Sequence, residues 1–399
     1  MKSSWLHPMV PLLAIVVACS SSTSLTPAGG AAGAPDSAAV VKGYAALVHA
    51  NYEATLEQMT TLQKAIDAFV AAPTQASFDA AKAAWVTARL PYLQSEAFRF
   101  AGGPIDSEPN GPEGMINGWP IDESYVDYVI GDAEAGIINK KADFPAITKD
   151  VIKDNNEKGG EKNLSAGWHV IEYLLWGQDL KADGTPNDAG TGTRPFTDFV
   201  DGGTAKNQDR RRAYLKAATV LMVEQFESVE VQWDLVPGTY ATKLVEGDPA
   251  VALSSILNGI GSLSGGELAN QRMSNAYKTK EQEEEHSCFS DTTNQDLVNN
   301  GVGIENVYLG RFGTTTGASI SDLVKAKDPA LDAKVRADLT AALDATKAIP
   351  VPFDNALLGA DDSDGRKRIK AAIDGWGVVK SDIVAIATAL GVKINLSQD

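Results

Sequence analysis

The sequence predicts an all-α protein built from two helical-bundle domains, and three observations support this prediction. Apolar residues recur three or four positions apart over long stretches, which is the spacing of one face of an α-helix. Regularly alternating short segments with hairpin turns, which indicate β-strands, do not occur. The 399 residues are 44% hydrophobic and 22% charged, so the chain has the apolar content and the length for two domains.

The chain begins, after its N-terminal segment, with two long predicted helices. Residues 38–71 keep a helical apolar pattern until Pro73, and a second helix starts near Gln75 with a kink expected at Pro91. Residues 102–120 are rich in glycine and proline, so we expect them to be irregular. Shorter helices are predicted over residues 121–130 and 144–154.

The central element of the predicted first domain is a helix that begins at Asn163 or Ser165 and ends at Gly177. It is apolar nearly all round, which is typical of a buried helix, yet His169 and Glu172 lie side by side on one of its faces. Burying this pair without partners costs on the order of several kcal/mol. The residue types suggest a metal ion as the partner.

The apolar spacing in the second half of the chain also predicts mostly long helices. Residues 178–204 lack periodicity and are expected to form a long loop. The order of features in residues 93–129 is similar to that in residues 283–310, which suggests an internal duplication. We place one bundle over residues 38–205 and the other over residues 206–399. The helices predicted after the loop cover residues 209–235, 248–285, 294–309, 328–348 and 365–390. The second of these could be kinked or divided by its glycines at positions 259, 261, 265 and 266.

The N-terminus is typical of an exported bacterial lipoprotein. Residues 1–18 combine a charged start with an apolar core too short to span a membrane, which predicts a signal peptide. The residues around Cys19 resemble a lipobox, so we expect cleavage before Cys19 and lipidation of its thiol. Cleavage of an ordinary secretory peptide nearby is the alternative. Residues 19–37 predict a flexible tether. A lipidated Cys19 leaves Cys288 without a disulfide partner and excludes a zinc site of several cysteines.

The composition narrows the classes of function. The net charge is −17, from 35 basic and 52 acidic residues, so nucleic-acid binding is not expected. The acidity is compatible with cationic ligands, and a solvated acidic surface is the simpler alternative. Patterns of zinc proteases (His-Glu-x-x-His), of serine hydrolases (Gly-x-Ser-x-Gly) and of phosphate loops are missing from the sequence.

The leading candidate site is the Gly-x-His-x-x-Glu pattern formed by Gly167, His169 and Glu172. Imidazole and carboxylate groups three residues apart on a helix can reach one metal ion, and the glycine leaves room for another backbone or a ligand. A surface ion pair is the simpler alternative for this spacing. The apolar neighbours make a surface position unfavourable. His49, on the first helix, is in contrast expected to be structural or exposed.

Two further segments contain candidate metal ligands. Glu285, His286 and Asp291 follow a run of glutamates, and they either complete a metal site or belong to the capped ends of two helices. Glu96 shares a helix face with Arg99, so it is either another carboxylate ligand or half of an internal ion pair.

The segment Gly167-Trp-His-Val-Ile-Glu-Tyr-Leu-Leu-Trp-Gly177 resembles the signature of the imelysin family. That family includes insulin-cleaving membrane protease and iron-regulated bacterial lipoproteins. The resemblance implies a fold of two bundle-like domains, a functional site around His169 and Glu172, export from the cytoplasm and a role in iron uptake. One departure is Asn294, where related sequences lead us to expect a histidine ligand. The segments that resemble the iron-regulated branch in particular are residues 89–106, 111–129 and 283–297.

We therefore expect an exported lipoprotein, in the periplasm or on the outer-membrane surface, that binds iron for uptake. Histidine and carboxylate ligands suit zinc or another divalent metal equally well. The expected partners are the metal ion, the membrane that holds the lipid anchor, and a protein of an uptake system. The alternatives are a metallopeptidase, for which the sequence identifies no general base, and a docking module for a transport or redox partner.

Overall fold

The computed structural model describes residues 36–107, 111–187 and 190–396. It confirms the all-α prediction, because the chain is 66% helical. The strands in the described part form one short hairpin, β1 (Arg311–Phe312) with β2 (Thr315–Thr316). The predicted signal peptide, Cys19 and the tether up to residue 35 lie outside the described residues. Within the described residues, no helix combines the length and the apolar character needed to cross a lipid bilayer.

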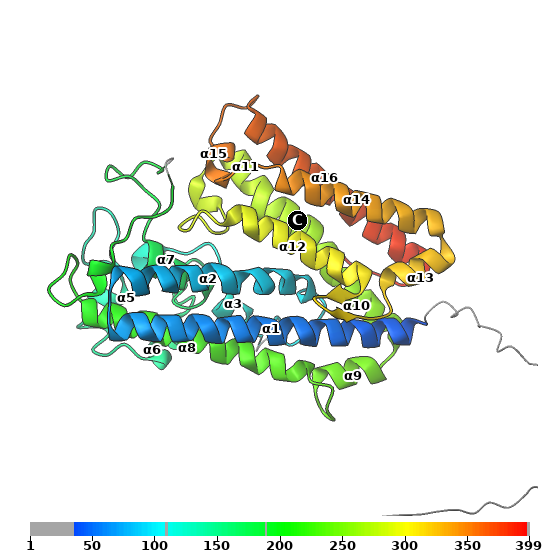
Figure 1. The fold of residues 1–399 in the computed structure, drawn as a ribbon, viewed down its shortest axis with the longest axis horizontal. Helices are drawn as coiled ribbons and strands as arrows, with labels where there is room; N and C mark the ends of the chain where they lie inside the picture. The colour runs from blue at the N-terminus through cyan, green and yellow to red at the C-terminus, as the bar shows by residue number, and fades with distance from the viewer. Residues whose placement is uncertain (1–35, 108–110, 188–189, 397–399) are drawn as a thin grey trace, which may run out of the picture. The chain divides into compact units, whose positions relative to one another are not determined.

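Helices α1 (Ser37–Ala71) and α2 (Gln75–Ser95) form a long hairpin, in which α2 contains Pro91 as predicted (Figure 1). The helix α8 (Gln208–Glu230) packs against α1 and also contacts α6 (Lys149–Asn155). The first helix after residue 205 therefore packs on helices from before it. The division into two bundles and the internal duplication stay predictions.

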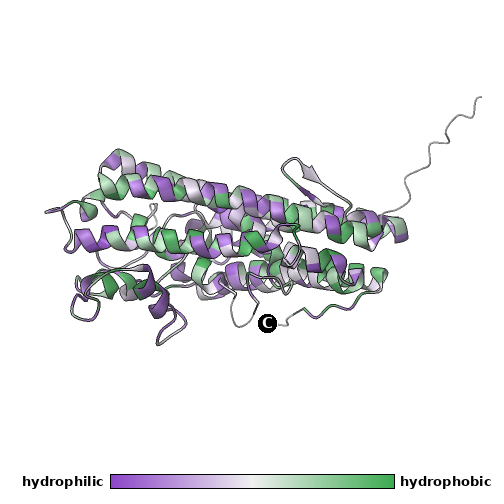
Figure 2. Cartoon of the chain, turned by 90° about the horizontal axis from the view of Figure 1, so that it is seen from below, coloured by the Kyte–Doolittle hydropathy of each residue, from purple (hydrophilic) through white to green (hydrophobic). Residues whose placement is uncertain are grey.

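A second group of helices covers α2 from the other side, as Figure 1 shows. Here α12 (Thr293–Leu309) contacts both α2 and α14 (Pro329–Lys347), and α14 packs along α16 (Asp364–Leu390). Figure 2 shows hydrophilic and hydrophobic residues alternating along the long helices. This alternation is what the three- and four-residue spacing of apolar residues predicts for helices buried on one side.

The helix predicted over residues 248–285 changes its geometry in the middle, in the region where its glycines could kink or divide it, and the predicted end at residue 285 is wrong. The segment begins as α10 (Pro249–Ser262), continues as a π-helix, η4 (Leu263–Ser274), and ends as α11 (Asn275–Thr279). Lys280 ends it in the left-handed conformation, with φ 59°. π-Helical turns do not change the apolar spacing enough to be recognised in a sequence. The glutamates that follow lie in a 3-10 turn, η5 (Gln282–Glu284), and not at a helix end.

The central helix α7 (Trp168–Trp176) has nine residues, and all are buried, as predicted. Its N-cap is Gly167, at φ 94°, so the predicted cap at Asn163 or Ser165 is wrong. A Cβ atom on Gly167 would lie 2.7 Å from the carbonyl oxygen of Ile116, which confirms that another backbone approaches there. Ser165 instead donates its hydroxyl to a carbonyl oxygen of α6. The predicted end at Gly177 is confirmed, at φ 75°.

The remaining elements are short, and five of the helices among them, α3, α5, α9, α13 and α15, were not predicted from the sequence. Segments this short show too few turns for a periodic pattern. The helices expected over residues 121–130 and 144–154 are also shorter in the structure. These elements are α3 (Glu113–Ile116), α4 (Glu123–Val126), α5 (Gly136–Asn139), α9 (Tyr240–Glu246), α13 (Ile320–Lys327), α15 (Phe353–Leu357), η1 (Glu96–Phe98), η2 (Phe196–Phe199) and η3 (Val231–Trp233).

Candidate metal centre

His169 and Glu172 meet on the buried face of α7. The Nδ1 atom of His169 lies 3.0 Å from Oε2 of Glu172, and at most 1% of either side chain is exposed. The other carboxylate oxygen, Oε1, accepts hydrogen bonds from the backbone N–H of Ser290 at 3.0 Å and from its hydroxyl at 2.7 Å. The carboxyl group is therefore held in place from both sides, and the imidazole ring is oriented through it.

Burial keeps this pair close to neutral. It lowers the pKa of His169 well below the usual histidine value, with further lowering by His286 and Arg89. Burial raises the pKa of Glu172 to about 8, against the hydrogen bonds from Ser290. The buried Nε2 atom of His169 has no hydrogen-bond partner among the described residues. A neutral imidazole with one nitrogen fixed by a carboxyl group and the other unused is a typical metal-ligand arrangement.

His286 repeats this arrangement opposite His169. The two ring centroids lie 4.8 Å apart, at an interplanar angle of 69°. The Nδ1 atom of His286 lies 2.6 Å from Oδ2 of Asp296, which also accepts the hydroxyl of Ser287 at 2.6 Å. Burial, with Arg272 and Arg89, lowers the pKa of His286 well below its usual value. We call His169, Glu172, His286 and Asp296 the histidine cluster.

A chain of arginine and amide contacts surrounds the histidine cluster and neutralises its acids. Arg89 of α2 donates to Oδ2 of Asp296 at 2.9 Å and to the side chain of Asn117 at 2.6 Å. Asn117 donates in turn to Glu96 at 2.7 Å, and Glu96 forms an ion pair with Arg272 of the π-helix η4. Burial alone would raise the pKa of Glu96, but Arg272 and nearby arginines lower it below the usual glutamate value.

Two cavities adjoin the histidine cluster. A cavity of about 20 Å³ is bordered by both His169 and His286, together with Cys288 and Glu123. This is room for roughly one water molecule or one small ion. A larger pocket of about 440 Å³ has His286 and Trp119 in its wall and is otherwise lined mainly by charged side chains. The candidate ligands are therefore close to the protein surface although they are buried.

Glu285 and Asp291, predicted as ligands of the same site, belong to a different group of side chains. Carboxylate oxygens of Asp179, Asp291 and Asp354 lie within 4.8 Å of one another. Glu285 is 1% exposed, and burial raises its pKa well above the usual glutamate value. Asp354, Asp291 and Asp179 each raise this pKa further. We call these four residues the acid cluster. Asp179 follows α7 and Asp354 lies in α15.

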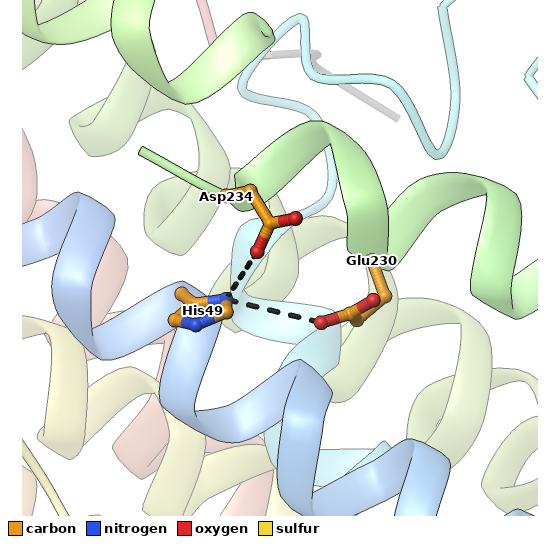
Figure 3. Close-up of side chains that lie close together, drawn as sticks. All are labelled: His49, Glu230 and Asp234. Atoms are coloured by element: carbon orange, nitrogen blue, oxygen red, sulfur yellow. Dashed lines mark ion pairs between the residues drawn. The ribbon is translucent and has the colours of Figure 1, made fainter. Parts of the chain in front are cut away.

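A third group of possible ligands lies nearer the surface and is shown in Figure 3. His49 of α1 points its Nδ1 atom toward the carboxylates of Glu230 and Asp234, at 3.9 and 3.7 Å. The side chain of His49 is 36% exposed and that of Asp234 is 45% exposed. The partly exposed position of His49 agrees with the prediction made for it.

The matched range of the imelysin family profile is residues 48–379, which is most of the chain. The chain belongs to the imelysin family. It is 25% identical over 319 residues to iron-regulated protein A of Synechococcus elongatus, and this match covers 77% of the chain and 74% of that protein. Both the family membership and the iron-regulated resemblance inferred from the sequence are thereby confirmed.

Two solved structures share the imelysin fold of this chain. A candidate iron-regulated protein A precursor from Parabacteroides distasonis superposes with a TM-score of 0.69 at 21% identity, covering 90% of this chain and 97% of that one. An imelysin-like protein from Psychrobacter arcticus gives a TM-score of 0.62 at 14% identity, covering 91% and 99%. At these identities the likeness establishes the fold.

The structure of this family member divides the predicted ligands between two places. His169, Glu172 and His286 lie together, and Glu96 joins them through Asn117, Arg89 and Asp296. Glu285 and Asp291 lie in the acid cluster. The alternative ion pair of Glu96 with Arg99 is replaced by the pair with Arg272, while Arg99 lies 2.9 Å from Glu113. Residues of the two clusters and their surroundings that sequence reasoning missed are Arg89, Asn117, Asp179, Arg272, Ser290, Asp296 and Asp354.

Asn294, where a histidine was expected, forms its hydrogen bonds with a different segment of the chain. Its amide donates to the carbonyl oxygens of Ile349 and Pro350, at 3.3 and 3.2 Å. Cys288 is a buried free thiol whose pKa burial raises well above the usual value, so it is a poor nucleophile at neutral pH. The hydrogen bonds of Asn294 to Ile349 and Pro350 agree with the expectation that a metal ligand at this position is in doubt once histidine is replaced.

Proposed function

We propose that this imelysin-family protein binds iron at the histidine cluster as cargo for uptake. The observation that supports this proposal is the pair of buried imidazoles, each with Nδ1 beside a carboxyl group, whose ring centroids lie 4.8 Å apart and which both border a cavity of about 20 Å³. Imidazole nitrogens are good ligands for ferrous iron and also for zinc. The unpartnered Nε2 atom of His169, buried among the described residues, fits such a ligand.

His169 and His286 would supply the two nitrogen ligands, and water or a carrier would fill the other positions. Glu172 and Asp296 would orient the rings rather than touch the ion, because their oxygens already meet Nδ1 atoms, Ser290, Ser287 and Arg89. A site with few protein ligands can release its ion again, which an uptake protein requires. Iron at His169 would also favour loss of the Glu172 proton, because a metal-bound imidazole keeps Nδ1–H against a carboxylate.

The decisive experiment is metal analysis of the purified protein after anaerobic loading with ferrous iron and gel filtration. We expect about one iron per wild-type chain and none in His169→Ala, with an unchanged circular dichroism spectrum. His49→Ala is the matched control, because it removes a histidine outside the cluster. Iron that remains bound in His169→Ala would disprove the assignment. Zinc that competes with iron at equal concentration would leave the site in place but change its cargo.

Peptide hydrolysis is less well supported by the same geometry. A metallopeptidase needs a carboxylate that is free to take a proton from metal-bound water. Both oxygens of Glu172 are engaged, by His169 and by Ser290. Metal-loaded protein incubated with unstructured peptides should therefore leave them intact. Cleavage that disappears in Glu172→Gln while the metal stays bound would favour the peptidase.

We also propose that the protein is an exported lipoprotein anchored through Cys19, facing the periplasm or the outer-membrane surface, which would deliver iron to a protein of an uptake system. The support is the signal-peptide and lipobox pattern of residues 1–19. Mass spectrometry of the N-terminal peptide from membranes should find a diacylglyceryl group on Cys19. In Cys19→Ser the protein should move to the soluble fraction. An unmodified Cys19 in the mature protein would disprove anchoring.

A further inference from the structure

The acid cluster lies where three separate segments of the chain meet. Asp179 comes two residues after Gly177 at the end of α7, Glu285 and Asp291 flank the turn before α12, and Asp354 lies in α15. Asp179 and Asp354 are 3% and 1% exposed, and Asp291 is half-buried. Acids from such distant positions are brought together only by folding, so the cluster is a property of the tertiary structure.

Glu285 is the feature that ordinary packing does not explain. Its side chain is 1% exposed, and neither carboxylate oxygen has a hydrogen-bond partner in the part of the chain that the structure describes. Burial and then Asp354, Asp291 and Asp179 raise its pKa, and the hydroxyl of Thr293 lowers it. Buried carboxylates are normally paired with a basic group, hydrogen-bonded or bound to a metal. Glu285 faces three other acids instead.

Neutral side chains around the cluster add oxygen atoms and support for Asp179. Gln282 donates its amide N–H to Oδ2 of Asp179, and Asn187 donates to Oδ1 at 3.1 Å. The Oε1 atom of Gln282 is buried and has no partner among the described residues. The carboxylate oxygens of the three aspartates therefore lie together, with Glu285 and the amide group of Gln282 beside them, and this group of described side chains contains no imidazole or thiol. Oxygen-only sets of this kind favour hard cations, whereas softer metals prefer nitrogen and sulfur.

We propose that the acid cluster is a calcium site, separate from the histidine cluster, with Asp179, Glu285, Asp291 and Asp354 as its ligands. Calcium takes six to eight oxygens at roughly 2.3–2.6 Å, so ligands on opposite sides of one ion lie about 4.6–5.2 Å apart. The carboxylate oxygens of the three aspartates lie within 4.8 Å of one another, which fits a single ion. Calcium there ties the end of α7 to α15 and to the turn before α12.

The proposal does not depend on the iron site. The His49 group of Figure 3 carries no comparable argument, because it contains its own titratable base and is partly exposed. In the acid cluster, each ligand change can be made without removing a hydrogen bond that the structure shows for Glu285. Glu285→Gln keeps the shape of the side chain, and Asp291→Asn suits the backbone, because Asn tolerates the left-handed φ of 54° at this position.

The test uses the purified full-length protein, stripped of metals with a chelator and titrated with calcium chloride at pH 7.5. We expect one calcium ion per chain by calorimetry and a melting temperature that rises with calcium concentration. Glu285→Gln and Asp291→Asn should each weaken calcium binding at least tenfold and should melt no lower than wild type without calcium. Glu281→Gln, an exposed neighbour, is the matched control and should bind like wild type.

His169→Ala should bind calcium as wild type does, which separates this result from any failure of the iron site. The proposal is overturned if metal-free wild-type protein shows neither heat of binding nor a melting shift up to roughly 10 mM calcium, above the range of weak extracellular sites. It is also overturned if Glu285→Gln and Asp291→Asn bind calcium with wild-type affinity, because the ion would then lie elsewhere.

Discussion

The histidine cluster and the acid cluster share one segment of chain but balance their charges in opposite ways. His286 and Asp296 face the first cluster, where Arg89 pairs with Asp296 at 2.9 Å. Glu285, next to His286 in sequence, faces the second cluster, where the named contributions to its raised pKa come from burial and from other acids. Burial and neighbouring acids also raise the pKa of Asp179 to about 8 and that of Asp291 to about 7.

The comparison shows two ways to balance the negative charge of a buried carboxyl group. The charge is balanced permanently by a basic residue of the same chain, or exchangeably by a proton or cation from solution. An arginine of the same chain is always charged and always present, so Asp296 needs nothing from solution. Two like charges at 4.8 Å repel by roughly 3–4 kcal/mol at an effective dielectric constant of about 20. This repulsion favours protons or a bound cation in the acid cluster, so we expect its state to depend on pH and on the ions in solution.

The largest expected effect is the loss of an arginine from the permanently balanced cluster. Arg89→Met should lower the free energy of unfolding by about 3–5 kcal/mol, because Asp296 is left buried without its ion-pair partner. Urea denaturation at pH 7.5 measures this loss. Arg311→Met removes an exposed pair with Glu305 and should cost less than about 1 kcal/mol. Equal losses in the two variants would show that burial does not distinguish them.

Ser290→Ala should have a moderate effect that is confined to the histidine cluster. The variant loses the hydroxyl hydrogen bond to Glu172 but keeps the backbone one, so we expect a loss of about 1–2 kcal/mol. Iron affinity should fall roughly tenfold, because the carboxyl group that orients His169 is less well held. The calcium-induced melting shift should not change. Ser381→Ala, at an exposed helix position, is the control. A change in calcium binding alone would contradict the separation of the clusters.

The acid cluster should make the metal-free protein less stable as pH rises. The pKa of Asp179 is about 8 in the folded state, above that of an unfolded aspartate near about 4. Between these values the folded state binds more protons than the unfolded state, so stability is lost as pH increases. We expect the melting temperature to fall by roughly a few °C from pH 5 to pH 8. A flat or rising profile without metals would contradict this assignment.

The smallest expected effect is a gain in stability from removing one acid. Asp291→Asn should raise the unfolding free energy of metal-free protein at pH 8 by up to about 1 kcal/mol, because one like charge is removed from a half-buried position. Thermal melting in the presence of a chelator measures the gain. Asp143→Asn, at an exposed position, should change nothing. A clear loss of stability in Asp291→Asn would mean that this carboxyl group makes a favourable contact.

Much of the fold could be predicted from the sequence, because amphipathic helices show a regular three- and four-residue spacing of their apolar residues. The helices around residues 38–71 and 365–390 and the buried character of α7 are confirmed. The errors occur where local chemistry departs from the α-helical repeat. Glycines within residues 248–285 indicated a possible break, but the widened turns of η4 are rare and could not be specified from the sequence. The start of α7 depends on Gly167 and its close approach to Ile116, a contact between distant segments that no local pattern contains.

The candidate site could be predicted only in part, for a similar reason. His169 and Glu172 share one helix turn, so their meeting follows from helix geometry alone. The contact between His169 and His286 required a hypothesis about two distant segments, and the structure brings them together. Asp179 and Asp354 are single acids outside any motif, and nothing in an acidic sequence separates them from solvated ones. The sign of the charge around Glu285 depends on tertiary neighbours and could not be read from its run of glutamates.

The π-helix η4 has a consequence for how this site can change. Arg272 reaches Glu96 from the far part of that helix, after several widened turns. If the widened turns kept their geometry, deleting one residue ahead of Arg272 would rotate all later side chains by roughly 100° around the helix axis. The guanidinium of Arg272 would then point away from Glu96, although both residues would still be present in the sequence. Helix length, more than residue identity, is therefore what this stretch of chain has to preserve.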